Sequence, residues 1–214
     1  RLDKKNKKNF SKEQIAILET ALSFINNDQK IEEIYSLFEK REIEISGLLS
    51  LKPSLYVCNV DEESIKTGNI YTKKFIEKYG DKNTIIISAE IESQINSFNN
   101  IEKKNYMEML GIKEPGIKKL TNKGYNLLNL ETFFTSGPEE SRAWTIKKNS
   151  LAPSAAGKIH TDFEKGFIKV ETVSYQDFVD NNGWVNSKNN GKMRLEGKEY
   201  VIKDGDVLNF RFNT

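Results

Sequence analysis

Apolar residues recur at helical intervals along the first fifty residues of the chain. Ser11 and Gln14 have the spacing of a capping box, in which each side chain accepts a hydrogen bond from the backbone N–H of the other residue. The apolar positions that follow are Ile15, Leu18, Leu22 and Ile25. A polar break at residues 26–28 ends this pattern, and a second helical pattern runs from residue 31 to residue 49. We therefore expect an antiparallel hairpin of two helices in residues 1–50.

From residue 51 the pattern changes to short apolar runs. Residues 54–58 and 84–87 are nearly continuous in apolar residues, and a helical stretch at 70–79 lies between them. Such runs, separated by a helix, predict parallel strands that are buried on both faces. Residues 91–126 have helical spacing, with an interruption at Glu114-Pro115-Gly116. The pattern therefore predicts an α/β unit over residues 51–128.

The last part of the chain, residues 129–214, is rich in β-branched and aromatic residues. Strand character is found at residues 132–135, 142–146, 168–173 and 207–212. A short helix is predicted at residues 175–180. Strands wrapped around one short helix indicate a β-grasp (ubiquitin-like) module, so the chain as a whole is predicted to combine α/β and α+β architecture.

Composition places the chain among soluble globular proteins. It has 214 residues, of which 37% are hydrophobic and 30% charged, and no apolar run approaches the roughly eighteen residues of a membrane span. The single cysteine, Cys58, excludes an internal disulfide and favours a reducing, cytoplasmic compartment. Inside an apolar strand it is read as a small buried residue, with a redox switch as the alternative. Because the chain does not begin with Met, we expect it to be part of a longer protein.

The net charge of +2 does not by itself indicate a nucleic-acid partner. The excess of positive charge lies in residues 1–12, whereas basic and acidic residues balance over residues 129–214. A block of like charge near a terminus is typical of a solvated tail or an exposed helix face.

Two candidate ligand-binding positions follow the two predicted parallel strands. Asn59 and Glu62 come after the first strand, and Ser88-Ala89-Glu90 comes after the second. Ligands of parallel sheets bind at the carboxyl ends of the strands, so these residues are candidates for one site. The alternative is that Asn59 only caps a loop after a strand.

The densest cluster of distinctive residues is the segment 155–167, which contains the chain's single histidine. His160 and Asp162 could serve acid–base chemistry, but no nucleophile or second metal ligand accompanies them. A structural role, in which His160 fixes a helix-to-strand turn, is the favoured interpretation. Gly157 and Gly166 are expected to serve tight backbone geometry, and Phe163 with Phe167 to be in the core.

These motifs together resemble the YchF/Obg-like ATPase family of P-loop NTPases. The strongest segments are residues 143–148, 155–167 and 192–212, and the resemblance extends over essentially the whole chain. It implies a helical hairpin (coiled-coil-like) domain at 1–50, the C-terminal part of a nucleotide-binding domain at 51–128 and a TGS β-grasp domain at 129–214. Residues 183–186 depart from the family pattern and are expected to be a surface loop.

The resemblance also implies which residues bind nucleotide. Related GTPases carry an NKxD motif at the first strand end, whereas this chain has Asn59-Val60-Asp61-Glu62, a form that favours adenine over guanine. The base would be bound by Asn59, Val60, Glu62, Ser88 and Ala89. The family hydrolyses ATP to ADP with Mg²⁺. No G-x-x-x-x-G-K-[ST] loop occurs in this chain, so we expect it to hold no catalytic or metal-binding residues and to be inactive alone.

The implied partners are nucleotide and the ribosome or ribosomal RNA, for a cytoplasmic monomer with no membrane contact. Candidate RNA or partner contacts are Lys158, Lys165, Lys169, Lys192 and Arg194, because cationic side chains neutralise phosphates. The alternative for these residues is a mixed, solvated surface. An alternative for the whole chain is a binding module that docks to the ribosome or a regulatory protein through the TGS domain. An editing piece of a tRNA synthetase is disfavoured because no zinc ligands are present.

Overall fold

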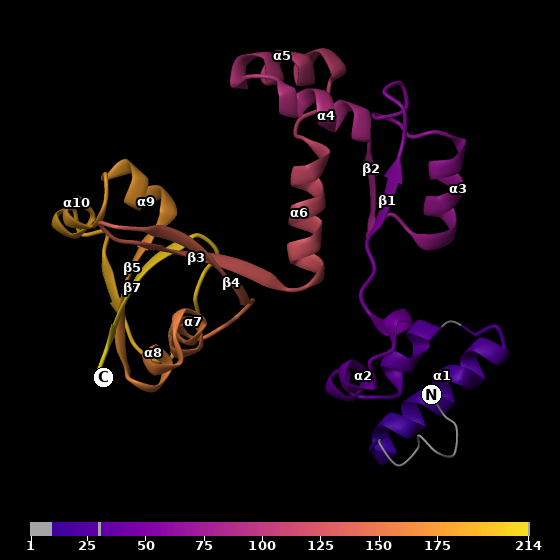
Figure 1. Cartoon of the computed structure of the whole chain (residues 1–214), viewed down its shortest axis with the longest axis horizontal. Helices are drawn as coiled ribbons and strands as arrows, with labels where there is room; N and C mark the ends of the chain where they lie inside the picture. The colour runs from indigo at the N-terminus through magenta and orange to yellow at the C-terminus, as the bar shows by residue number, and fades with distance from the viewer. Residues whose placement is uncertain (1–9, 30, 214) are drawn as a thin grey trace. The chain divides into compact units, whose positions relative to one another are not determined.

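The computed structural model describes residues 10–29 and 31–213. It divides the chain into two compact units, Arg1–Ser54 and Leu55–Thr214 (Figure 1). Most of the predicted basic run at residues 1–12 lies outside the described residues. Each unit is described by itself below.

The first unit begins with helix α1 (Lys12–Asn26). The predicted capping box is confirmed, because the Ser11 hydroxyl accepts from the Gln14 N–H at 3.2 Å and the Gln14 side chain accepts from the Ser11 N–H at 2.9 Å. The Gln14 amide also donates to the carbonyl of Ile45 at 3.0 Å. The core of this unit is apolar and consists of Ile17, Ala21, Ile34, Ile43 and Leu51.

The second arm of the predicted hairpin is not one helix. The 3₁₀-helix η2 (Ile31–Ser36), helix α2 (Lys40–Ser46) and the 3₁₀-helix η3 (Leu49–Leu51) take its place. Glu39, with ψ of 145°, is extended and caps α2, and Gly47, with φ of 65°, ends it in a left-handed conformation. Apolar spacing alone did not distinguish three short helices that share a core from one straight helix.

The second unit begins with two parallel strands, as predicted, but the first of them is not buried on both faces, because Val57 within it is 43% exposed. Strands β1 (Tyr56–Asn59) and β2 (Thr84–Ile87) pair in parallel, and Asn59 lies opposite Ile87. Helix α3 (Ile70–Tyr79) connects them. The carboxyl ends of both strands are therefore at the same edge.

Three helices fill the stretch that was predicted to be helical with one interruption. They are α4 (Ala89–Ser97), α5 (Asn100–Leu110) and α6 (Gly116–Leu127). The predicted interruption at residues 114–116 is confirmed. The additional break lies at Asn99, whose side chain accepts from the backbone N–H of Glu102 while the Glu102 carboxylate accepts from that of Asn99, both at 3.0 Å.

Helix α6 is anchored to the loop that precedes β2. The Lys123 ammonium group donates to the backbone carbonyls of Thr84 at 2.8 Å and Lys82 at 3.1 Å. A side chain on α6 thereby satisfies carbonyl groups that the strand pairing leaves open.

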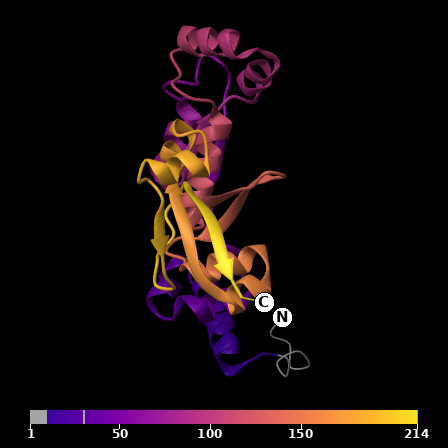
Figure 2. The same ribbon diagram turned by 90° about the vertical axis from the view of Figure 1, so that its left-hand side faces the viewer.

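The rest of the second unit is built on a mixed five-stranded sheet of order β4-β3-β7-β5-β6. Its strands are β3 (Leu130–Ser136), β4 (Ser141–Lys147), β5 (Phe167–Ser174), β6 (Arg194–Glu196) and β7 (Asp206–Phe212). Figure 2 shows β5 and β7 side by side, and they are antiparallel. Strands β3 and β7 are parallel. The short strand β6 was not predicted.

Helix α7 (Ala152–Ile159), for which no range was predicted, packs against one face of this sheet in a β-grasp arrangement. Ala152, Ala155 and Ala156 are fully buried there against Phe133 and Phe210, so small residues let the helix approach the strands closely. Phe167 belongs to this core and Phe163 packs against it, which confirms the expectation for both.

Three more short helices follow, of which only α9 (Tyr175–Asp180) was predicted. The others are α8 (Thr161–Lys165) and α10 (Trp184–Asn189). The segment expected to be a surface loop at residues 183–186 therefore enters a helix. Among the helices that the structure describes, none is both long enough and apolar enough to cross a membrane.

Candidate functional site

The two parallel strand ends are joined by a side chain. The Asn59 Oδ1 atom accepts a hydrogen bond from the backbone N–H of Ala89 at 2.9 Å. The Val60 N–H donates to the carbonyl of Ile87, also at 2.9 Å. This bond extends the backbone hydrogen bonding between β1 and β2 by one residue beyond β1. The sequence-predicted residues Asn59, Val60 and Ala89 are thus brought together at one edge of the sheet.

Ser88 and Val60 are both buried at this edge of the sheet. Ser88 is 1% exposed, and its hydroxyl accepts from the Ile91 N–H at 3.5 Å as the N-cap of α4. The Val60 side chain is 8% exposed, and its carbonyl oxygen accepts no hydrogen bond from any residue that the structure describes. Ser88 therefore positions Ala89, and Val60 presents a free backbone acceptor.

Glu62 is exposed and lies beside the strand ends in an open hollow of about 650 Å³, here called the Glu62 hollow. Its lining combines carboxylates, a lysine and apolar side chains: Asp61, Glu62, Glu63, Ile65, Lys66, Glu90, Met109 and Leu110. Acidic and apolar groups side by side suit a planar ligand that carries hydrogen-bond donors at its edge.

Helix α5 supplies residues to this region that the sequence interpretation missed. Met109 and Leu110 line the hollow. Tyr106 interacts electrostatically with two carboxylates of the hollow, those of Glu62 and Glu90. Burial first, and then the negative charges of Glu62 and Glu90, raise the pKa of the Tyr106 phenol. The sequence around these residues contains no recognisable motif. The turn at Asn99 brings α5 back toward the strand ends, and local sequence spacing does not reveal that placement.

The helix that carries Ala89 is tied to α6 by one carboxylate. The Glu92 side chain accepts from the backbone N–H of Gly116 at 2.5 Å and from that of Ile117 at 3.2 Å. A Cβ atom at Gly116 would lie 2.7 Å from Ile87 Cγ2 and 2.9 Å from the Glu92 carboxylate. The start of α6 is therefore packed directly behind the strand end, and a side chain at Gly116 would disturb it.

His160 has the structural role that was favoured for it, at a different junction. Its Nδ1 accepts from the Asp162 N–H at 3.2 Å and caps α8, so it lies between two helices and not between a helix and a strand. Its side chain is 60% exposed, and the Asp162 carboxylate is 3.5 Å away. Within the described residues, His160 and Asp162 form their hydrogen bond and their close approach with each other and with no nucleophile.

The predicted basic contacts fall into two groups. Lys192 lies 3.1 Å from the Asp177 carboxylate, whose pKa is lowered by hydrogen bonds from Ser174 and then Lys192. Arg194 lies 3.4 Å from the Glu196 carboxylate, and its charge is therefore also partly neutralised. Three candidates are exposed and form no ion pair with the part of the chain that the structure describes: Lys158, Lys165 and Lys169. Cys58, next to Asn59, is half-buried and has a free thiol.

No cluster of three or more His, Cys, Asp or Glu side chains that could hold a metal ion occurs within residues 10–29 and 31–213.

Known proteins are similar to this chain over most of its length. The family model YchF-GTPase_C, described as "Protein of unknown function (DUF933)", matches residues 130–213. A protein named "Ribosome-binding ATPase YchF" from Escherichia coli O157:H7 is 42% identical over 206 residues, which are 95% of this chain and 56% of that protein. The protein of the same name from Bacillus subtilis strain 168 is 48% identical over 170 residues, 78% of this chain and 46% of that protein.

A solved structure is similar over nearly the same range. "Structure of the Schizosaccharomyces pombe YchF GTPase" has a TM-score of 0.74 and 34% identity, and the match covers 94% of this chain and 55% of that chain. The present chain thus spans about half the length of the relatives it matches. On sequence and on structure together, the chain belongs to the YchF family.

Proposed function

We propose that this chain contributes the base-binding edge of an ATP-hydrolysing protein. The observation that carries the proposal is the hydrogen bond from the Ala89 N–H to Asn59 Oδ1, because it fixes the amide of Asn59 at the strand ends. The nucleotide would lie across Asn59, Val60, Glu62 and Ala89, with Ser88 supporting Ala89. The relatives named above as ATPases support this assignment.

The free hydrogen-bonding groups at this edge favour adenine. Since Asn59 Oδ1 is already engaged, its Nδ2 group is left to donate to a ring nitrogen of the base. The open carbonyl of Val60 can accept from the exocyclic amino group of adenine, whereas the oxygen of guanine at that position is an acceptor and would be repelled. Glu62 and Glu90 add acceptors at the same side of the Glu62 hollow.

Hydrolysis is proposed for the whole protein and not for these 214 residues. The chain contains no phosphate-binding loop sequence, so it has no backbone cradle or Ser/Thr hydroxyl for the phosphates and Mg²⁺. We therefore propose that the chain binds adenine nucleotide weakly and does not turn it over. The assignment of 1–50 as a helical hairpin domain, 51–128 as part of the nucleotide-binding domain and 129–214 as a TGS domain belongs to this proposal.

A nucleotide titration of the purified chain tests this function. We expect AMP to bind more tightly than GMP by calorimetry or ligand-detected NMR, and no phosphate release from ATP above background. Equal binding of AMP and GMP would contradict the adenine preference. ATP turnover that Asn59→Ala removes would contradict the inactivity of the chain.

A second proposed function is docking to the ribosome through the β-grasp module. It is supported by the relatives named "Ribosome-binding ATPase" and by the exposed, unpaired Lys158, Lys165 and Lys169. Lys192 and Arg194 would contribute only after releasing their carboxylate partners. A cytoplasmic, monomeric protein without membrane contact fits this role.

Co-sedimentation with ribosomes at two salt concentrations tests the docking. Phosphate contacts predict that less protein sediments at high salt, because bound cations displace condensed counterions. Sedimentation that does not change with salt would contradict a phosphate-based contact, and absence of sedimentation would contradict docking by this chain.

A further inference from the structure

One face of the five-stranded sheet carries a polar row that the base site does not use. Side chains alternate between the two faces of a strand, and Val170 and Phe210 face the α7 core. Their neighbours Lys169, Arg211 and Asn209 therefore lie on the opposite face, which α7 does not cover.

Two cations stand directly across from one another on this face. Lys169 on β5 is the register partner of Arg211 on β7. Like charges directly opposite in a sheet repel each other. Only one carboxylate compensates them, because Glu171 lies 3.1 Å from Arg211, while Lys169 forms no ion pair with any described residue. An excess of positive charge therefore remains at this point of the sheet.

An aromatic hollow adjoins the cation pair on the same face. It has a volume of about 750 Å³ and is here called the Trp184 hollow, with lining from the β3–β4 turn, helices α9 and α10, and β7: Ser136, Gly137, Pro138, Phe178, Val179, Asn182, Gly183, Trp184, Val185 and Asn209. Asn209 connects the two features, because it lines the hollow and its amide donates to Glu171 at 2.7 Å.

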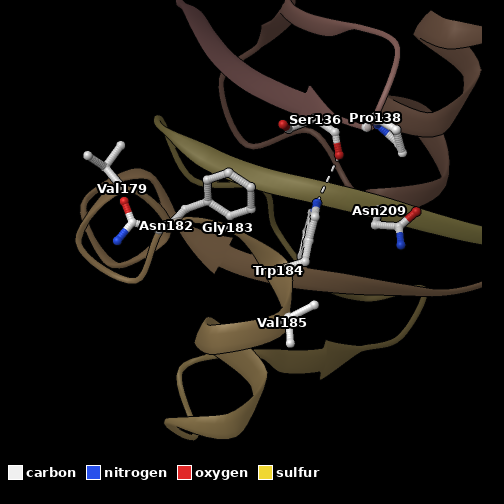
Figure 3. Close-up of a pocket in the computed structure, with 10 residues that line it drawn as sticks. Ser136, Pro138, Val179, Asn182, Gly183, Trp184, Val185 and Asn209 are labelled. Carbon is white, nitrogen blue, oxygen red and sulfur yellow. Dashed lines mark hydrogen bonds between the residues drawn. The ribbon is translucent and has the colours of Figure 1, made fainter.

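The indole ring of Trp184 is held in a fixed orientation. Its Nε1–H donates to the Ser136 carbonyl at 2.9 Å, and Figure 3 shows the ring directed toward Ser136, with Asn209 beside it. The ring of Phe178 contacts it edge-on, with centroids 5.2 Å apart. Trp184 is half-buried, so part of its surface remains open to a ligand.

We propose that this face binds a short single-stranded segment of RNA. A base would enter the Trp184 hollow and contact the indole, Asn182 and Asn209 would meet base edges, and the flanking phosphates would lie over Lys169 and Arg211. A planar aromatic group beside an excess of positive charge, here the unpaired Lys169 next to Arg211, is the combination that binds single strands. The proposal deepens the docking function above by naming its surface and ligand, and it does not depend on the base site at Asn59.

The test uses the 214-residue chain and a fluorescein-labelled, unstructured RNA of about twelve nucleotides, with binding followed by anisotropy. Trp184→Ala is expected to weaken binding roughly tenfold through lost stacking. Lys169→Gln and Arg211→Gln are each expected to lower the slope of log K against log salt by about one charge. Lys74→Gln, an equal charge change on α3, is the control and should leave binding unchanged.

Trp184→Phe separates stacking from a structural effect. Phenylalanine keeps an aromatic ring but loses the hydrogen bond to Ser136, so binding should persist while the part of the RNA-dependent fluorescence quenching that comes from Trp184, and not from Trp144, is lost. Circular dichroism verifies that each variant is folded. If Trp184→Phe weakens binding as much as Trp184→Ala, the ring acts only through the fold and the proposal is wrong.

Other outcomes would also overturn the assignment. Equal weakening by Lys158→Gln would place the RNA on the α7 side of the sheet. Competition by free AMP at matched nucleotide concentration would indicate a mononucleotide site, and unchanged RNA binding in all variants would exclude this face. Ribosome sedimentation of the same variants separates the proposals: if Trp184→Ala and Arg211→Gln still sediment, docking stands and this surface does not mediate it.

Discussion

The side-chain oxygen of Asn59 lies 2.9 Å from the backbone nitrogen of Ala89, thirty residues later in the chain. This hydrogen bond connects the end of β1 to the first residue of α4, so the loop after one strand fixes the loop after the next. The amide oxygen of Asn59 therefore holds the loop, and the proposed contact with a base would fall to its nitrogen.

Substitution of Asn59 should distinguish these roles. Asn59→Asp keeps the acceptor for Ala89 and loses the N–H donor, so we expect near-normal stability and weakened AMP binding. Asn59→Ala loses both and should also lower the free energy of unfolding by about 1 kcal/mol. Urea unfolding and nucleotide titration measure the two effects. Equal AMP affinity for wild type and Asn59→Asp would show that the nitrogen does not contact the base.

Glu92→Ala should loosen the start of α6. The carboxylate caps the N–H groups of Gly116 and Ile117, so its loss should cost about 1–2 kcal/mol in urea unfolding. Glu77→Ala, at an exposed position on α3, is the matched control and should change stability by less than about 0.5 kcal/mol. Faster hydrogen exchange at Gly116 and Ile117 would accompany the loss, and unchanged exchange there would contradict the capping role.

Gly166→Ala should be strongly destabilising, because the added methyl group would collide with the backbone of Asn213. A Cβ atom at this position would lie 1.9 Å from the carbonyl oxygen of Asn213, whose N–H donates to the Gly166 carbonyl at 2.8 Å. We expect a loss of about 1–3 kcal/mol. Gly124→Ala, where a Cβ atom would meet nothing within 4 Å, should instead stabilise α6 by about 0.5–1 kcal/mol. Similar melting temperatures for the two variants would be inconsistent with this close approach.

Tyr200 should ionise at a higher pH than an ordinary tyrosine phenol. Burial first, and then the hydrogen bond to Asp206 and its charge, raise the pKa of Tyr200 from 10.0 to about 12, while Arg194 opposes them. Since the folded state holds this proton more tightly than the unfolded state, its stabilising effect is complete below about pH 10. It is lost as the pH rises through about 12.

An ultraviolet titration of tyrosinate against Tyr200→Phe measures this late step. The difference between the two proteins should be small at about pH 10 and should develop only as the pH approaches the raised pKa. A difference that develops fully at the ordinary tyrosine pKa would show that Tyr200 is solvated like an exposed phenol.

The sequence predicted the structural elements that depend on residues close together in the chain. The capping box at Ser11, the short helix at residues 175–180 and the parallel strands that end at Asn59 and Ile87 are all present. Each depends on spacing within a few residues, which a sequence displays directly. The placement of Asn59 near Ala89 followed from the rule that parallel strands share one edge.

Features that depend on distant segments were missed. The second arm of the first unit breaks at Glu39 because Ile34, Ile43 and Leu51 share one core, and apolar spacing did not reveal that core. Tyr106 and Met109 reach the strand ends only through the fold of α5. The break at Asn99 was different, because its reciprocal cap with Glu102 is a local signal that the sequence interpretation passed over.

The position of β7 in its sheet has a consequence for biosynthesis. It lies between β3 and β5, yet it follows every other strand of that sheet in the chain. During translation, the β3–β4 and β5–β6 pairs can form early but stay unconnected until residues 206–212 have left the ribosome. Nascent chains that stop before Asp206 should therefore expose two separate strand pairs with open edges, and only synthesis of the last strand closes the sheet.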